Sequence, residues 1–266
     1  MKMRRLFALA AVAAVFSFSS CQQEEDSVAN NEVSEATLTQ ISQLGFNTDN
    51  VQRVEGGYLV EGDIILSASD LSDAQNVQKL RVGEAEQYRT TNLVSVGTTR
   101  TIKVAVSTSL PSAYVAAVDE AISRYNDENL KLNFQRVSSG YDILLTKSPS
   151  NATYLASAGF PTGGNPHNKV LINSTYLGSN PGTNYLATIL AHEIGHCIGF
   201  RHTDYMDRSY SCGGSYYNEG ASTVGAIQVP GTPSNADPNS WMLACIGTGQ
   251  NRPFNTNDVT ALNYLY

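Results

Sequence analysis

Residues 192–202 read His192-Glu193-Ile194-Gly195-His196-Cys197-Ile198-Gly199-Phe200-Arg201-His202, and this stretch decides how the chain is interpreted. The chain has only four histidines, and three of them fall here. His192 and His196 are four residues apart, so a helix would project both imidazoles from one face, one turn apart. The spacing therefore predicts a helix that presents two metal ligands side by side.

The rest of the stretch predicts a third ligand and a base. Gly199 can adopt a positive φ, which lets the chain leave the helix and turn back sharply. We expect this turn to bring His202 to the same metal. Three imidazole nitrogens leave a fourth tetrahedral position for water, which is the arrangement of a catalytic zinc site. Glu193 can reach that water without binding the metal, so we predict that it is the general base. The alternative is a polar helix with hydrogen-bonded histidines, which requires five fixed positions to coincide by chance.

Composition restricts the remaining possibilities. A chain of 266 residues with 41% hydrophobic residues can form one large or two smaller domains. The net charge of −7 is unevenly distributed, because residues 22–99 hold thirteen acidic and four basic side chains whereas residues 100–266 are almost neutral. The sequence contains no basic patch, so we expect no nucleic-acid partner.

The first twenty residues have the features of a signal peptide. Lys2, Arg4 and Arg5 precede a short apolar stretch that ends at Phe18-Ser19-Ser20-Cys21. This end resembles the lipobox of bacterial lipoproteins, which implies cleavage before Cys21 and attachment of lipid to it. The acidic stretch that follows is similar to one that directs some lipoproteins to the outer face of the outer membrane. We therefore expect a lipid-anchored surface protein. Ordinary secretion with a free Cys21 stays open as an alternative.

Three further cysteines can form one disulfide. An exported chain permits such a bond, and an odd number of cysteines leaves one thiol over. Cys197 lies within the metal helix, Cys212 follows His202, and Cys245 lies shortly after Met242. We favour a bond between Cys212 and Cys245, which would tie the loop after the helix to the floor of the site. A bond between Cys197 and Cys212 stays open.

The pattern of apolar residues predicts an α+β fold. After a polar N-terminal region with a short helix and a β-like segment near residues 58–66, strands and helices follow in the order β-α-β-β-β-α, then a long loop and a last helix. We expect strands at 102–106, 130–137, 141–146 and 169–172, and helices at 35–44, 112–129, 183–196 and 256–265.

With these features in view, residues 100–266 resemble the metzincin zinc peptidases, and the HEIGH residues at 192–196 are those of the dual-action HEIGH metallopeptidase family. The resemblance implies a twisted, mostly parallel sheet with an antiparallel edge strand, an active-site helix, a methionine turn below the zinc and a C-terminal helix. Met242 in Ser240-Trp241-Met242-Leu243 is the candidate for that turn; a plain core methionine is the alternative. The edge strand, which would bind the peptide substrate, is expected near residues 155–159.

The chain departs from astacin-like metzincins at two positions. Thr203 stands where they carry a glutamate, and Ala244 stands where they carry a tyrosine that assists the oxyanion. The oxyanion-stabilising residue is therefore unassigned among the four nearby tyrosines, Tyr205, Tyr210, Tyr216 and Tyr217. Asp204 is expected either to orient a histidine or cap a turn, or to lie at the surface.

A second resemblance concerns the acidic N-terminal part. Val60-Glu61-Gly62-Asp63-Ile64 is similar to the F-x-G-D element of astacin propeptides, whose aspartate occupies the catalytic zinc position. We therefore predict that Asp63 binds the zinc in a latent precursor, with a signal peptide at 1–20, a tether and inhibitory prosegment at 21–99 and a catalytic domain at 100–266. Arg89 and Arg100 are candidate activation sites in an exposed linker. An ordinary β-turn at Gly62-Asp63 is the alternative.

These observations together predict a secreted or surface-anchored endopeptidase with one catalytic zinc. Its partners would be protein or peptide substrates and its own prosegment, and the mature catalytic domain would either stay anchored or be released. The rival hypothesis is a non-catalytic, zinc-containing surface-binding lipoprotein. A structural zinc would usually have a fourth protein ligand. His167 is the only other histidine, and it lies in a loop rich in glycine, proline and asparagine.

Overall fold

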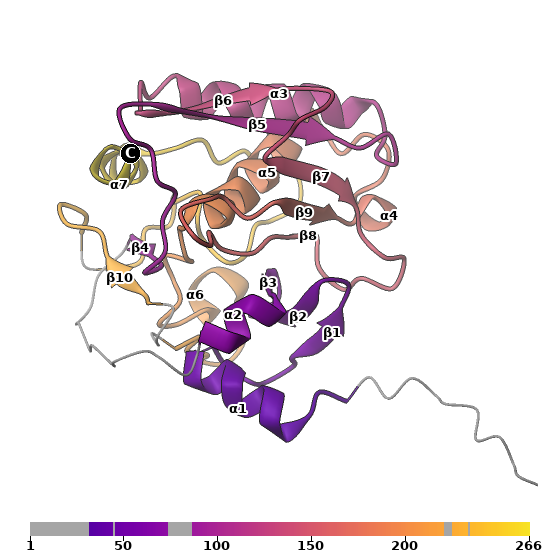
Figure 1. Cartoon of the computed structure of the whole chain (residues 1–266), viewed down its shortest axis with the longest axis vertical. Helices are drawn as coiled ribbons and strands as arrows, with labels where there is room; N and C mark the ends of the chain where they lie inside the picture. Colours follow the sequence, from indigo (N-terminus) through magenta and orange to yellow (C-terminus); the bar gives the residue numbers. More distant parts are fainter. Residues whose placement is uncertain (1–31, 45, 74–86, 221–224, 234) are drawn as a thin grey trace, which may run out of the picture. The chain divides into compact units, whose positions relative to one another are not determined.

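The chain forms a mixed α+β structure around one five-stranded sheet. The structure is a computed structural model that describes residues 32–44, 46–73, 87–220, 225–233 and 235–266. The strand order is β6-β5-β7-β9-β8 (Figure 1). Four strands are parallel and β8 is antiparallel to β9, which confirms the predicted sheet with its antiparallel edge strand. The bounds are Arg100–Val106 (β5), Leu132–Arg136 (β6), Ile143–Lys147 (β7), Ala156–Ser157 (β8) and Lys169–Ile172 (β9).

Two long helices pack on each other and complete the main core. They are α3 (Ala113–Asn126) and α5 (Thr183–Ile198), and the latter carries the first two histidines of the motif. Apolar side chains of β5, such as Ile102 and Val104, share one buried cluster with residues of both helices. Almost every residue of α5 is buried. A helix enclosed in this way holds its side chains in fixed positions, which suits a site that needs defined geometry.

The C-terminal helix α7 (Thr256–Leu265) begins with a capping box. The side chain of Asn255 accepts hydrogen bonds from the backbone of Asn257 and Asp258, and the Asp258 side chain accepts from the backbone of Asn255. This exchange satisfies amide groups that the first turn of a helix leaves without partners. Asp258 also accepts from the backbone N–H of Trp241, so the start of α7 is tied to the segment around Met242.

A small N-terminal unit precedes the large sheet and contacts its edge. Its elements are α1 (Glu35–Leu44), β1 (Gln52–Val54), β2 (Gly57–Val60), β3 (Ile64–Leu66) and α2 (Ala68–Asp73), and the three strands form an antiparallel sheet. The Ala158 N–H donates to the Asp63 carbonyl, and the Ile65 N–H donates to the Ala158 carbonyl. The N-terminal unit thus extends, over a few residues, the edge of the five-stranded sheet next to β8.

Short elements account for most differences from the prediction. The sequence missed α2, β1, α4 (Ser174–Leu177), α6 (Ser209–Cys212), and the antiparallel pair β4 (Tyr88–Arg89) and β10 (Ile227–Gln228). Segments of two to six residues are too short to establish a period. Arg89 and Arg100, expected in an exposed linker, lie in β4 and β5, respectively. No helix in the described part of the chain has the length and apolarity needed to cross a membrane.

Candidate metal centre

Helix α5 places the first two histidines side by side in the interior. The rings of His192 and His196 lie 4.6 Å apart between centroids. His192 Nδ1 lies 2.9 Å from the Trp241 carbonyl oxygen, and His196 Nδ1 lies 2.8 Å from that of Phe200. A carbonyl oxygen can only accept a hydrogen bond, so each Nδ1 carries the proton and donates. Each Nε2 is therefore left with a free lone pair, as a metal ligand requires.

A left-handed glycine turns the chain back to deliver His202. Gly199 ends α5 with φ of 114°, a conformation that side chains rarely adopt. A Cβ at this position would also lie 2.7 Å from a methyl carbon of Leu93 and 3.0 Å from the Asn92 carbonyl oxygen. The turn stacks the ring of His202 on that of His192 at 5.3 Å, as the sequence predicts for the third histidine.

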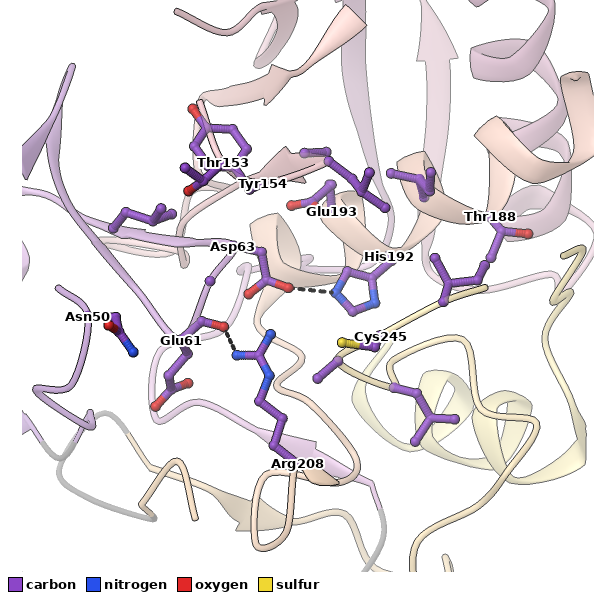
Figure 2. A pocket seen from close by; sticks show the side chains of 18 of the residues that line it. Asn50, Glu61, Asp63, Thr153, Tyr154, Thr188, His192, Glu193, Arg208 and Cys245 are labelled. Carbon is purple, nitrogen blue, oxygen red and sulfur yellow. Dashed lines mark hydrogen bonds and ion pairs between the residues drawn. The ribbon is translucent and has the colours of Figure 1, made fainter. Parts of the chain in front are cut away.

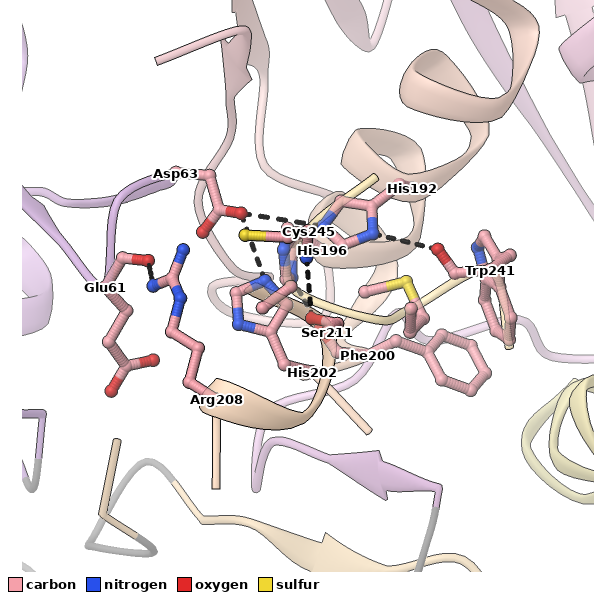
Figure 3. A network of polar contacts seen from close by, with 12 residues as sticks. Glu61, Asp63, His192, His196, Phe200, His202, Arg208, Ser211, Trp241 and Cys245 are labelled. Carbon is pink, nitrogen blue, oxygen red and sulfur yellow. Dashed lines mark hydrogen bonds and ion pairs between the residues drawn. The ribbon is translucent and has the colours of Figure 1, made fainter. Parts of the chain in front are cut away.

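Asp63 of the N-terminal unit completes this group of four buried side chains. Its Oδ2 lies 3.1 Å from His202 Nε2 and 3.7 Å from His192 Nε2. One nitrogen or oxygen atom from each of Asp63, His192, His196 and His202 lies within 4.8 Å of all the others. Figure 3 shows the carboxylate pointing at the histidine cluster from the opposite side to α5. The structure thus brings together all four residues that the sequence predicts as zinc ligands.

The unpaired atoms of this group fit a metal ion. Nε2 of His192 and Nε2 of His196 are buried and make no hydrogen bond. Buried polar atoms are normally paired, so a converging set of free acceptors needs a shared partner. Three imidazole nitrogens and one carboxylate oxygen are the donors that suit zinc in a tetrahedral site. The residues present therefore fit the metal that the motif implies.

Glu193 lies beside this group at the wall of a cavity of about 500 Å³. The cavity lining includes His192, Asp63, Tyr154 and Arg208 as well as Glu193 (Figure 2). The carboxylate of Glu193 is almost fully buried, and its Oε2 has no hydrogen-bond partner. A carboxylate in this position is free to accept a proton from a molecule that enters the cavity, which is the role that the sequence predicts.

Burial and neighbouring charges shift the protonation of the site strongly. Burial would raise the pKa of Asp63, but the nearby histidines, His202 above all, hold that pKa well below its usual value. Burial would lower the pKa of His202, but Asp63 and Glu219 raise it well above the usual value. Burial, with a further contribution from Asp63, raises the pKa of Glu193. The acids around His202 thus favour positive charge where the donor atoms converge.

The segment around Met242 forms the floor below the histidines. Met242 is fully buried, and its carbonyl oxygen accepts from the Thr203 N–H at 3.0 Å, directly after His202. A Cβ at Gly195 would lie 2.6 Å from the Met242 sulfur and 3.2 Å from Trp241 Nε1. The glycine of the helix therefore allows the methionine to approach the helix backbone. Met242 thus lies against the helix that carries His192 and His196, and its role in a methionine turn stays a prediction.

Sequence reasoning missed Glu219, a buried acid that holds the third histidine. Its two carboxylate oxygens lie 2.9 Å and 3.0 Å from His202 Nδ1, and one of them lies 3.3 Å from Arg208 Nη1. Arg208 Nη1 also donates to the Glu61 carbonyl oxygen of the N-terminal unit. Glu219 comes from an irregular segment with no periodic pattern, so only its charge in a stretch rich in tyrosine and glycine distinguished it.

A disulfide joins Cys212 to Cys245 across the loops beside the site, whereas Cys197 is a buried free thiol. Asp204 is also buried, and it accepts from the Ala244 N–H and the Ser211 hydroxyl, so it ties the same two loops together. It contacts no histidine through a hydrogen bond in the described part of the chain. Cys21 lies outside the described residues.

The four candidate tyrosines lie in different environments. Tyr217 lines the cavity, and burial raises its pKa to about 12. Tyr205 is buried and packs edge-on against Tyr88, whereas Tyr210 and Tyr216 are exposed. Among these four, only Tyr217 has a place in the cavity wall.

Comparison with known proteins identifies a family. The model of the dual-action HEIGH metallopeptidase family matches residues 58–266, a range that starts within the predicted prosegment and includes Asp63. No curated protein sequence matches the chain. Two solved structures of myroilysin are similar: one at 13% identity covers 64% of this chain and 82% of its own, with a TM-score of 0.39. The other, at 14% identity, covers 72% of this chain and 99% of its own, with the same TM-score.

Proposed function

Because the chain belongs to the dual-action HEIGH metallopeptidase family, and is therefore a metallopeptidase, we propose that it is a zinc-dependent endopeptidase of the metzincin type that is made as a latent precursor. One observation carries the proposal. The free nitrogens of His192 and His196 converge with His202 and Asp63 beside an unpaired Glu193 carboxylate, at the wall of a cavity.

The residues around the site have separable roles in peptide hydrolysis. His192, His196 and His202 would hold the metal, and a bound zinc ion would supply Lewis-acid chemistry by polarising a carbonyl group and acidifying water. Glu193 would accept a proton on Oε2 from the attacking water and return it to the leaving amine. The carbonyl groups of Trp241 and Phe200, with the Glu219 carboxylate, would keep each imidazole in the orientation and tautomer that binding needs.

The edge of the sheet next to β8 would bind an extended peptide. In the present structure Ala158 exchanges two backbone hydrogen bonds with residues 63 and 65 of the N-terminal unit. A substrate would use the same backbone groups by adding a strand to this edge, a common mode of peptide recognition. The N-terminal unit and a substrate would therefore compete for one place.

This competition would make the precursor latent. Asp63 places its carboxylate among the three histidines, so it would occupy the coordination position that water needs for catalysis. Proteolytic removal of the N-terminal unit would free both the coordination position that Asp63 holds and the backbone groups of the edge strand. The precursor would be exported by its predicted signal peptide and anchored by lipid on Cys21. The mature domain would stay at the cell surface or be released.

The same arrangement of ligands is compatible with the alternative function, that of a non-catalytic surface lipoprotein with a structural zinc. Asp63 would then be a permanent fourth ligand of a closed site. Glu193 separates the two candidates, since a structural site needs no unpaired carboxylate beside the metal.

The test is hydrolysis of casein by the full chain after proteolytic activation, with and without a zinc chelator. We expect chelator-sensitive cleavage and one zinc per chain. The Glu193→Ala variant should keep its zinc and lose activity by several orders of magnitude, because general-base catalysis and water orientation are both removed. An active Glu193→Ala protein would exclude the proposed mechanism. Zinc binding without cleavage by any form would favour the structural role.

A further inference from the structure

A buried cation next to the metal ligands is paired with an acid from the N-terminal unit. Arg201 directly precedes His202, and its Nη2 lies 2.7 Å from Glu61 Oε2, with both side chains completely buried. Arg208 Nη1 donates to the carbonyl oxygen of the same residue, Glu61, as Figures 2 and 3 show. Two guanidinium groups of the catalytic domain thus hold one residue that lies two positions before Asp63.

The backbone at this point is adapted to the contact. Glu61 has φ of 52°, a conformation that residues other than glycine rarely adopt. Gly62 follows with φ of 90°, and a Cβ there would lie 3.0 Å from Arg208 Nη2. A cost in backbone strain is maintained only where surrounding contacts compensate for it. The two arginines therefore form a fitted receptor for the residue at position 61.

Arg201 would lose much of this environment when the N-terminal unit leaves. Its guanidinium also packs on the ring of Phe46, a second residue of that unit, at 4.9 Å. What stays is the Gly220 carbonyl oxygen at 3.1 Å and the Tyr205 ring at 5.7 Å, while Nε has no hydrogen-bond partner. A guanidinium cannot give up its proton, so the cation persists and needs an anion in place of Glu61.

The catalytic domain does not provide that anion among its described residues. Among the described residues, the carboxylate that forms an ion pair with Arg201 is that of Glu61, which belongs to the N-terminal unit. Glu219, the buried acid nearest to Arg208, is already bonded to His202. The positive charge that Glu61 neutralises in the precursor would therefore face the opened cavity beside the metal.

We propose, on the basis of the peptidase function above, that the place of the Glu61 carboxylate is a substrate subsite for an acidic side chain, with Arg201 as its specificity-determining residue and Arg208 as a donor to the backbone of the residue that fills it. The N-terminal unit fills this subsite in the precursor. A cleaved protein or peptide substrate would fill it with an aspartate or glutamate a few residues from the scissile bond. A charge-assisted hydrogen bond to a guanidinium is about twice as strong as a neutral one, so the preference should be measurable.

The first arm of the test uses the proteolytically activated full chain and pairs of quenched fluorescent peptides that differ by Glu against Gln at each position around the scissile bond. We expect one position at which the Glu peptide has a kcat/KM about tenfold or more higher, the size of a charge-assisted hydrogen bond. Equal rates at every position would overturn the inference while leaving the peptidase function intact. Failure to cleave any peptide would instead overturn the proposed function, and this inference with it.

The second arm assigns the preference to residues. Arg201→Met should bring the Glu/Gln ratio close to one, whereas Arg136→Met, which removes a surface arginine paired with Asp119, should leave the ratio unchanged.

A third arm requires no variant enzyme. A synthetic peptide of residues 58–66 should inhibit the activated enzyme, and its Glu61→Gln version should inhibit about tenfold less well. Equal inhibition by the two peptides would contradict an acid-binding subsite even if Arg201→Met does not fold.

Discussion

At the scale of single residues, three hydrogen bonds decide how the histidines face the metal. Two carbonyl oxygens and one carboxylate accept from the three Nδ1 atoms, so each ring directs Nε2 to the common point. The carboxylate is the exception in this set because it carries a charge. Glu219 both orients His202 and raises its basicity, which strengthens binding of a cation.

Replacement of Glu219 should therefore weaken zinc binding before it affects the fold. We expect Glu219→Ala to raise the zinc dissociation constant by about 10–100-fold, the usual effect of losing such a partner. Glu219→Gln should have a smaller effect, because its amide oxygen can still accept. Competition with a chromophoric chelator measures both, and Glu120→Ala at a partly exposed ion pair is the control. An unchanged constant in Glu219→Ala would show that the contact is incidental.

The close contact between Gly195 and Met242 predicts how a substitution at Gly195 changes the stability of the protein. A methyl group there would meet the Met242 sulfur at 2.6 Å, so Gly195→Ala should lower the free energy of unfolding by about 1–3 kcal/mol through overpacking. The cost should shrink when Met242 is also replaced by alanine, because the obstructing side chain is gone. Urea denaturation of the two single variants and the double variant measures this coupling. Simple additivity of the three values would contradict a direct contact.

At the scale of elements, the segment around β4 is hydrogen-bonded to the part of the chain that carries the histidines. The Gln87 side chain is buried and donates to Ser240 and Asp258, and the Tyr88 carbonyl accepts from the Arg201 N–H. The Thr90 N–H donates to the Gly199 carbonyl at the end of α5. These contacts brace the turn that delivers His202, so activation at Arg89 or Arg100 would remove part of the site's support.

A protein that starts at residue 87 should consequently be more stable than one that starts at residue 100. We expect the shorter form to lose several degrees in Tm and to bind zinc more weakly, because the buried Gly199 carbonyl and Asp258 carboxylate lose the hydrogen bonds that Thr90 and Gln87 donate. Calorimetry and chelator competition on the two forms provide the comparison. Equal Tm and equal zinc affinity of the two forms would mean that the catalytic domain starts at residue 100, and would favour Arg100 as the activation site.

The capping box of α7 predicts a pH dependence of stability. Burial raises the pKa of Asp258 to about 7 in the folded state. The folded state then binds the proton more tightly than the unfolded state, so this contribution is complete below about pH 4 and is lost as the pH rises through about 7. Each unit of pKa difference corresponds to about 1.4 kcal/mol.

The measurement compares the wild-type chain with Asp258→Asn, which cannot titrate, in urea denaturation of the zinc-free proteins from pH 4 to pH 8. We expect the advantage of the wild type to shrink across this range. An advantage that is constant or grows with pH would mean that the carboxylate is already ionised at low pH.

The long elements could be predicted from sequence because their patterns are local. The helix 183–196 and the four parallel strands repeat apolar residues over enough positions to show a period, and the histidine spacing is contained within one helix and its turn. Glu219, Gln87 and the partner of Arg201 could not be predicted, since each contact joins segments without periodicity that only the tertiary fold brings together. Glu61 and Arg201, for example, are 140 positions apart.

At the scale of the whole molecule, the N-terminal unit contacts the rest of the chain through three polar contacts near the metal centre, a carboxylate, a strand at the sheet edge and a buried ion pair, and through more distant ones such as Phe46 on Arg201. The three polar contacts near the metal centre all lie within residues 61–65. This arrangement supports the proposed latency, because the contacts nearest the metal centre come from one short segment. It also implies that a single substitution at the centre should weaken the inhibition without removing the rest of the contact.

Latency through Asp63 is tested most directly by the peptidase activity of the uncut full chain, compared between the wild type and Asp63→Ala. Glu55→Ala, which removes an exposed acid of the same unit and its ion pair with Lys169 of β9, is the matched control for a contact away from the metal centre. We predict negligible activity for the wild type and for Glu55→Ala, and chelator-sensitive cleavage of small peptides by uncut Asp63→Ala at ten times the wild-type rate or more, on the order of the loss of one metal ligand. An uncut wild type as active as Asp63→Ala would contradict latency through Asp63.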